Sequence, residues 1–455
     1  MQLQKIIAII SAIFTLLPSY LISFLPSKTD ADFTVEDKVY ELSMENGKYS
    51  FSFGGEKTEF FNYFGIKYSS DAYIKGTLTY VQGIDEISED FFLEPAENGE
   101  FYSLTDGYLS RKKAHKLIKI EFSPLDKSVS DFSLNGFSCF NRAVSETEIY
   151  IENDEYKLGV NLDWGGALSY LEDKNSSVEA VKVNGITKVD SDASSRYNAR
   201  AVSKNVNLIN ANDTGRLIQQ SYYGTGDFEG YTGGVFMGNK WNYNPVQGGN
   251  QFDDPAKIVD VKISDDYIYI KCRPMDWAKE KEYITPSYME ATYSLSEGLV
   301  KAECRFVDYS GYPAFTTSQE CPAFYCVEPL NRLVYYSGDA PWTGDKTLSY
   351  ENDLIFWPDA GYPHFTATEN WAAFIGEFDD SFGIGLYVPN EASFLAGVYE
   401  RGNCSTSDPA TESPTSYIAA IESYEFRSFN PTSYTFYLST GTADEIRDNF
   451  SAIAK

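Results

Sequence analysis

Short runs in which apolar and polar residues alternate recur from about residue 32 to about residue 440. Examples are YSFSF, YIKGTLTY, KLIKIEF, YIYIKCRP, VKAECRFVDY and SYTFYLSTG, separated by turns rich in Gly, Asp and Asn. Such alternation is typical of half-buried antiparallel strands, with one face against a core and the other toward water. Aromatic residues, which are enriched in strands, make up 16% of the chain. The sequence therefore predicts an all-β fold with little helix.

The chain has 455 residues, which is enough for two domains. The runs in residues 32–145 predict a small jelly-roll-like β-sandwich, and its aromatic residues predict either a carbohydrate-binding surface or ordinary packing. Residues 146–455 continue the β pattern without a linker, which favours one large two-sheet sandwich. A short helix is expected over Ala443–Ala454, with Thr442 as its N-cap.

The N-terminus carries the apolar run Ile6–Pro26 directly after Lys5. A basic residue followed by a long apolar segment is the pattern of an export signal. The run is also long enough to cross a bilayer, so an uncleaved anchor is the alternative. We interpret residues 1–31 as a signal peptide or N-terminal anchor and expect a secreted or cell-surface protein. This segment would be its only contact with a membrane.

The formal net charge of the chain is −29. A field of this sign repels phosphate backbones, so nucleic acid is not an expected partner. Two histidines and six widely spaced cysteines do not form the usual pattern of a zinc site, and we expect neither a metal nor a cofactor. The cysteines are interpreted either as buried free thiols or as one or two disulfides, with Cys272–Cys304 as the first candidate.

Several segments after residue 200 combine amide, charged and aromatic side chains. A sugar presents hydroxyls around its ring edge and C–H groups on its faces, so a sugar site needs hydrogen-bonding groups together with flat aromatic platforms. These segments therefore predict a carbohydrate-binding site. The candidate substrate-binding residues are Arg216, Gln220, Tyr223, Trp241, Asn244, Gln247, Asp276, Trp277 and Trp342.

Four short elements stand in an order that resembles the aldose 1-epimerase, or galactose mutarotase-like, superfamily. They are Asp163-Trp164-Gly165-Gly166-Ala167, Gly215-Arg216, Gln247-Gly248-Gly249 and Ile421-Glu422-Ser423. The resemblance covers about residues 147–455 and implies a large β-supersandwich. It also implies substrate elements at Arg216 and Gln247 and a base at Glu422. The chain departs from the family in its acid, because Gln247 stands where the family carries His and His364 lies outside the expected position.

Glu320 is the leading catalytic candidate, because it lies among Cys, Pro, Phe and Tyr residues that should raise the pKa of its carboxyl. With Asp213 or Glu422 as a second carboxylate, it predicts a glycoside hydrolase that acts on an oligosaccharide or polysaccharide. A polysaccharide lyase or epimerase that uses Tyr222, Tyr223 or His364 is one alternative. A carbohydrate-binding protein without chemistry is the other.

Overall fold

The computed structural model describes residues 33–55, 57–106, 112–126, 131–143, 146–174, 180–183, 200–203, 207–279, 284–352, 354, 364–376, 382–404 and 408–454. The proposed signal segment, residues 1–31, lies outside them. The described chain consists of antiparallel strands with little helix, so the predicted all-β fold is confirmed. None of the described helices is long and apolar enough to span a membrane.

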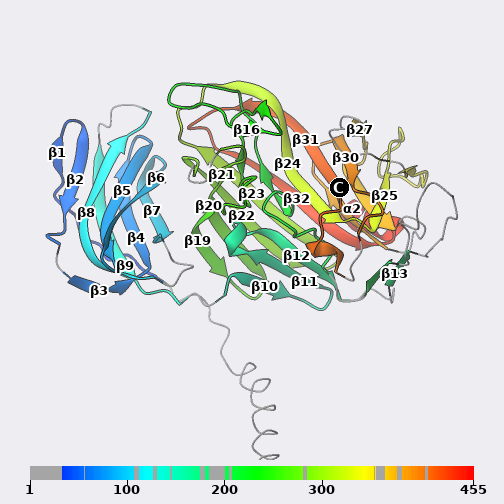
Figure 1. The fold of residues 1–455 in the computed structure, drawn as a ribbon, viewed down its shortest axis with the longest axis horizontal. Coiled ribbons are helices and arrows are strands. Elements are labelled where there is room, and N and C mark those ends of the chain that lie inside the picture. Colours follow the sequence, from blue (N-terminus) through cyan, green and yellow to red (C-terminus); the bar gives the residue numbers. More distant parts are fainter. Residues whose placement is uncertain are drawn as a thin grey trace, which may run out of the picture.

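The strands between residues 43 and 140 form two sheets, shown in blue and cyan in Figure 1. One sheet has the order β1 (Ser43–Glu45), β2 (Lys48–Ser52), β8 (Ala114–Pro124), β5 (Ile74–Gln82) and β6 (Asp85–Leu93), with β3 (Lys57–Phe61) beside β8. The other consists of β7 (Ala96–Leu104), β4 (Tyr63–Ser70) and β9 (Phe132–Phe140). Buried aromatic residues such as Phe64, Phe91 and Phe122 fill the space between them.

The larger part of the chain contains a ten-stranded sheet. Its order is β10 (Glu148–Glu152), β11 (Tyr156–Asn161), β12 (Ala167–Asp173), β15 (Ile218–Ser221), β24 (Phe315–Val327), β31 (Thr415–Phe426), β30 (Ser393–Tyr399) and β27 (His364–Thr366). The short strand β18 (Pro245–Val246) pairs with β15, and β21 (Met275–Asp276) pairs with β18.

A nine-stranded sheet packs against the ten-stranded one. Its order is β19 (Lys257–Ile263), β20 (Tyr267–Arg273), β22 (Ser287–Ser296), β23 (Leu299–Asp308), β32 (Thr432–Gly441), β29 (Gly383–Tyr387), β28 (Trp371–Gly376), β25 (Leu330–Tyr335) and β26 (Ser349–Glu351). Two further hairpins pair β13 (Ala180–Val183) with β14 (Arg200–Ser203) and β16 (Val235–Phe236) with β17 (Asn239–Lys240). Two short 3-10 helices cover Leu162–Trp164 and Pro409–Thr411.

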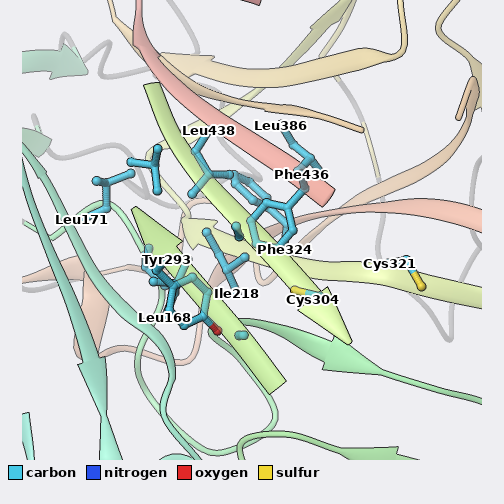
Figure 2. Close-up of a cluster of buried hydrophobic side chains, with 14 of the residues drawn as sticks. Leu168, Leu171, Ile218, Tyr293, Cys304, Cys321, Phe324, Leu386, Phe436 and Leu438 are labelled. Carbon is cyan, nitrogen blue, oxygen red and sulfur yellow. The ribbon is translucent and has the colours of Figure 1, made fainter. Parts of the chain in front are cut away.

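The main hydrophobic core lies between these two sheets. Ile218 and Phe324 of the ten-stranded sheet are buried together with Phe436 and Leu438 of the nine-stranded sheet (Figure 2). Because side chains alternate along a strand, the neighbours of Ile218 and Phe324 point to the opposite face of the ten-stranded sheet. That outer face carries the candidate site.

The N-terminal sheets are joined to the nine-stranded sheet by buried contacts. Phe92 stacks on Tyr309 with ring centroids 4.9 Å apart, and its amide donates to the hydroxyl of Tyr288 over 2.8 Å. Arg142 forms a buried ion pair of 3.2 Å with Asp260. The predicted domain boundary near residue 145 falls between β9 and β10 and remains a prediction.

The aromatic residues considered as a carbohydrate surface in the N-terminal part pack internally. Phe101 is buried and stacks on Phe91, and Tyr102 stacks on Tyr63. Tyr108, the third aromatic residue of that segment, lies outside the described residues. The described members of this group therefore support packing rather than recognition.

The expected C-terminal helix is confirmed as α2, Ala443–Ile453. Thr442 caps it, because its hydroxyl accepts the amide of Glu445 while the Glu445 side chain accepts the amide of Thr442. The helix buries Ile446 and Phe450 against Trp371 of β28.

The disulfide proposed between Cys272 and Cys304 is wrong, because all six cysteines are free thiols. Cys272 lies on β20 and Cys304 on β23, and β22 runs between these strands. Adjacent strands are about 4.8 Å apart, so residues separated by two strand spacings exceed the Cα distance of about 4.4–6.8 Å that a disulfide requires. The alternative interpretation, free thiols, is confirmed.

Candidate functional site

A pocket of about 240 Å³ opens on the outer face of the ten-stranded sheet. Strands β15, β18 and β24 form its floor, and the segments around β16 and after β21 form its wall. The lining residues are Gly215, Gln219, Ser221, Tyr223, Phe236, Trp241, Asn244, Val246, Trp277, Glu320, Ala323 and Tyr325.

The strand register explains how the floor is assembled. Ser221 of β15 lies opposite both Val246 of β18 and Glu320 of β24. Paired residues in antiparallel strands share a face, so these three side chains point into the pocket together. Gln219 lies two residues before Ser221 and lines the same face, since the side-chain period of a strand is two. The carboxyl of Glu320 is thus fixed by the sheet rather than by a loop.

Three aromatic rings form the wall. The ring of Phe236 lies 5.1 Å from Trp241 and 5.5 Å from Trp277, edge to face in both cases. Gly215 allows Trp277 to approach, because a Cβ at this position would lie 2.5 Å from Cη2 of the indole. The wall offers flat apolar surface to a ligand that lies against it.

Glu320 is partly buried and hydrogen-bonds to a tyrosine. The hydroxyl of Tyr223 donates to its Oε2 over 3.0 Å. Burial raises the pKa of the Glu320 carboxyl above its usual range, and the hydroxyl groups of Tyr417 and Tyr223 offset only part of this rise. The raised pKa favours the protonated acid, which can donate a proton to a ligand in the pocket.

Asn244 fixes the orientation of the wall relative to the floor. Its Oδ1 accepts the indole N–H of Trp241 over 3.1 Å, and its Nδ2 donates to the carbonyl of Tyr222 over 2.7 Å and to Oγ of Ser221 over 3.2 Å. The side chain is 2% exposed. Asn244 therefore links the aromatic wall to β15.

Five of the predicted residues are brought together in this pocket. They are Tyr223, Trp241, Asn244, Trp277 and Glu320. Their roles in binding and catalysis remain predictions, but their convergence comes from segments that are up to about 100 residues apart in the sequence.

Asp213 and Arg216 flank the lining residue Gly215 in the sequence but do not line the pocket themselves. They form an ion pair with each other. Oδ1 of Asp213 also accepts the amides of Gly215 and Arg216 over 3.0 and 3.1 Å, while Nη2 of Arg216 donates to the carbonyl of Ser413 over 3.0 Å. Both side chains are engaged in holding this turn.

Four predicted substrate-binding residues lie elsewhere. Gln220 and Gln247 are each 1% exposed, and Gln247 Oε1 accepts the amide of Gln220 over 3.2 Å on the core side of β15. Asp276 is fully buried behind the aromatic wall. Trp342 packs against Tyr387, at a ring distance of 6.0 Å, beside helix α2. None of these four lines the pocket.

Glu422 does not lie in the pocket with Glu320. In the register of β24 and β31, Glu320 lies opposite Ile421, whereas Glu422 lies opposite Gln319. Consecutive residues of a strand point to opposite faces, so Glu422 leaves the sheet on the other side from Glu320. Burial raises the pKa of the Glu422 carboxyl, but this group does not line the pocket.

Several lining residues were not among the predicted site residues. They are Gly215, Gln219, Ser221, Phe236, Val246, Ala323 and Tyr325. The signal that could have identified Gln219 and Ser221 is the alternation along β15, since both share a face with Tyr223. Phe236 lies in a short hairpin, β16–β17, whose position depends on contacts with residues after β21.

The described residues contain no cluster of three or more His, Cys, Asp or Glu side chains arranged to hold a metal ion. Among the lining residues that the structure describes, Glu320 alone carries a carboxylate. The chemistry available in the pocket is therefore that of one acid, several neutral polar groups and an aromatic wall.

The chain matches no known protein-family model and no curated protein sequence. Among solved structures, it is similar to a galactose mutarotase-like protein from Lactobacillus casei, with 12% identity and a TM-score of 0.38 over 64% of this chain and 99% of that one. A galactose mutarotase related enzyme from Lactobacillus acidophilus gives 11% identity and a TM-score of 0.36 over 66% and 99% of the two chains.

A third similar structure is a GH36 alpha-galactosidase from Geobacillus stearothermophilus. It has 9% identity and a TM-score of 0.35, and the match covers 66% of this chain and 41% of that one. The similar solved structures thus include proteins described as galactose mutarotase-like and as an aldose 1-epimerase. What the pocket can bind follows from its own side chains.

Proposed function

We propose that this protein binds a carbohydrate in the pocket at Glu320 and donates a proton from Glu320 to the oxygen of a glycosidic bond, as a glycoside hydrolase. The observation that carries the proposal is the placement of a carboxyl with a raised pKa beside the wall formed by Phe236, Trp241 and Trp277. Acidic groups of this kind serve as general acids near neutral pH.

The pocket is suited to a single sugar ring. Its volume of about 240 Å³ is below the roughly 300–1,000 Å³ of pockets that enclose drug-sized ligands. The C–H face of a sugar can lie on Trp241 or Trp277, while Ser221 and Glu320 offer hydrogen bonds to its edge. One ring would thus be held with its glycosidic oxygen toward Glu320.

Asp213 is the second carboxylate of the proposed hydrolase, because it lies beside the lining residue Gly215, whereas Glu422 leaves the opposite face of the sheet. Hydrolysis with two carboxylates requires the second group to activate water or attack the sugar. The ion pair of Asp213 with Arg216 fixes the position of this carboxylate.

One observation favours a second candidate, a carbohydrate-binding protein without chemistry. The oxygens of Asp213 already accept bonds from Arg216, from the amide of Gly215 and from the side chain of Asn212. A carboxylate with these bonds satisfied is a poor base. In this case the wall and Glu320 would only hold the sugar.

The proposal includes export, since the apolar run after Lys5 has the pattern of a signal segment. Cell fractionation and N-terminal sequencing of the mature protein test this part. Recovery of the full-length chain in the cytoplasm would contradict it.

Incubating the full chain with a panel of polysaccharides and oligosaccharides separates the functions. A hydrolase releases new reducing ends, a lyase releases unsaturated ends that absorb ultraviolet light, and a binding protein retains the glycan without releasing either. New reducing ends are the expected result. Binding without new ends would favour the second candidate, and unsaturated ends would contradict both.

A further inference from the structure

Asp276 is buried behind the aromatic wall, next to Trp277 in the sequence, and it does not line the pocket. Its Oδ2 accepts the hydroxyl of Tyr231 over 2.7 Å, and its Oδ1 accepts the amide of Ala278 over 3.3 Å. Tyr231 begins the segment that leads to Phe236 and Trp241. The carboxylate therefore joins the two segments that supply all three rings of the wall.

Other bonds also join the two segments. The amide of Val235, next to Phe236, donates to the carbonyl of Ala278 over 3.3 Å, and Nζ of Lys279 donates to the carbonyl of Thr232 over 2.8 Å. Gly234 lies close to Ala278, because a Cβ on Gly234 would be 2.0 Å from the carbonyl oxygen of Ala278. The segments are in direct contact, with Asp276 as the buried charge between them.

We propose that Asp276 is a positioning residue, which holds Trp277 and Phe236 in place through Tyr231 and the amide of Ala278 and so sets the shape of the pocket. This inference rests on the proposed function in assigning the pocket to a sugar. The sequence predicted a substrate-binding role for Asp276, whereas its burial excludes direct contact with a ligand in the pocket.

The charge of Asp276 should change near pH 6. Burial raises the pKa of its carboxyl to about 6, against the lowering effects of the hydrogen bonds from Tyr231 and Ala278 and of the charge of Lys279. The titratable and charged groups that act on it are Tyr231 and Lys279, and the ammonium of Lys279 lies 5.4 Å from the centre of the Tyr231 ring.

Protonation of Asp276 changes a charge-assisted bond from Tyr231 into a neutral one, and charge-assisted bonds are about twice as strong. The wall should therefore be held less firmly below about pH 6 than above it. Because Trp277 and Trp241 are part of the wall, their fluorescence should report this change.

The test is a fluorescence titration of the full chain without sugar, from about pH 5 to about pH 8, with acrylamide as quencher. We expect a transition near pH 6 in the wild type that is absent in D276N and is strongly reduced in W277F. In Y231F the midpoint should move to higher pH, because the hydroxyl that lowers the pKa of Asp276 is gone. If D276N does not fold, the shift of the midpoint in Y231F tests the proposal by itself.

The matched control is Y269F. It removes a partly buried hydroxyl outside the pocket, which donates to Oε2 of Glu290 over 2.7 Å. It should leave the transition unchanged. A transition that persists in D276N, or a midpoint that does not move in Y231F, would overturn the assignment. Since no sugar is present, failure of the proposed function would leave this result intact.

The kinetics of the full chain on its glycan supply a second measurement. If Asp276 only positions the wall, D276N should raise KM several-fold with little change in kcat, since Glu320 is untouched. A loss of kcat at unchanged KM would contradict a positioning role.

Discussion

The hydroxyl of Tyr223 donates a hydrogen bond of 3.0 Å to Oε2 of Glu320, and Tyr223 lies just after β15, whose Ser221 lies opposite Glu320 of β24. A donor to a carboxylate stabilises its charged form and lowers its pKa. Burial nevertheless dominates and leaves the pKa of Glu320 raised. The balance between these two effects controls the pH range in which Glu320 can act as an acid.

Replacing Tyr223 by Phe removes the donor, so the pKa of Glu320 should rise further. A general acid works only when protonated, and activity is lost as pH rises through its pKa. The alkaline limb of the pH profile of kcat/KM should therefore move to higher pH in Y223F. Y335F, which removes a hydroxyl bonded to Glu351 away from the pocket, should leave the limb in place. A shift to lower pH in Y223F would contradict this account.

Removing Trp277 from the wall should weaken glycan binding. An aromatic contact contributes about 0.5–1.5 kcal/mol beyond the area it buries, so W277A should raise Kd by about tenfold. Isothermal titration calorimetry with the glycan that the wild type retains measures this. W342A is the control, because Trp342 packs beside helix α2, and equal weakening in both variants would show that the wall has no specific role.

The buried carboxyl of Glu320 should make stability depend on pH. Its folded-state pKa is raised, so its contribution to stability is present below the pKa of the unfolded chain and is lost as pH rises through the folded value. Gln at this position stays neutral. E320Q should therefore gain stability relative to the wild type at about pH 8, and the difference should shrink toward about pH 4 in urea unfolding. E303Q, on an exposed part of β23, should show no such trend.

Helix α2 is attached through a buried ion pair between Arg447 and Glu369, with bonds of 2.6 and 2.8 Å. Glu369 also accepts the indole N–H of Trp371 over 3.0 Å. Removing one partner leaves an uncompensated buried charge, which typically costs about 3–5 kcal/mol. R447M should lower the free energy of unfolding by this amount, whereas K301M, in an exposed pair with Glu303, should change it by less than about 1 kcal/mol. Equal losses would rule out the buried pair as an anchor.

The alternation of apolar and polar residues was sufficient to predict the all-β fold, and Thr442 followed by a helical segment was sufficient to predict the capped C-terminal helix, because both depend on local patterns. The raised pKa of Glu320 was also predicted from its neighbours, since Cys321 and Phe324 belong to a strand that is buried on one face. Local sequence thus carries information about burial, and burial accounts for the raised pKa of Glu320.

The remaining site residues could not be assigned because a one-residue step along a strand reverses the direction of a side chain. Gln220 and Gln219 are both polar, yet only Gln219 lines the pocket. Glu422 and Ile421 differ in the same way, and only the register with β24 shows which of them shares a face with Glu320. Asp276 precedes Trp277 but is buried, and its carboxylate accepts the hydroxyl of Tyr231, which lies 45 residues earlier in the sequence.

The central claim is that the protonated carboxyl of Glu320 supplies the catalytic acid of the pocket, and E320Q tests it most directly. The substitution keeps the shape of the side chain and removes its titratable proton. The account predicts that E320Q retains the glycan with a Kd close to that of the wild type while the release of new reducing ends falls by about 10²–10⁴-fold. Full release of reducing ends by E320Q would contradict the account.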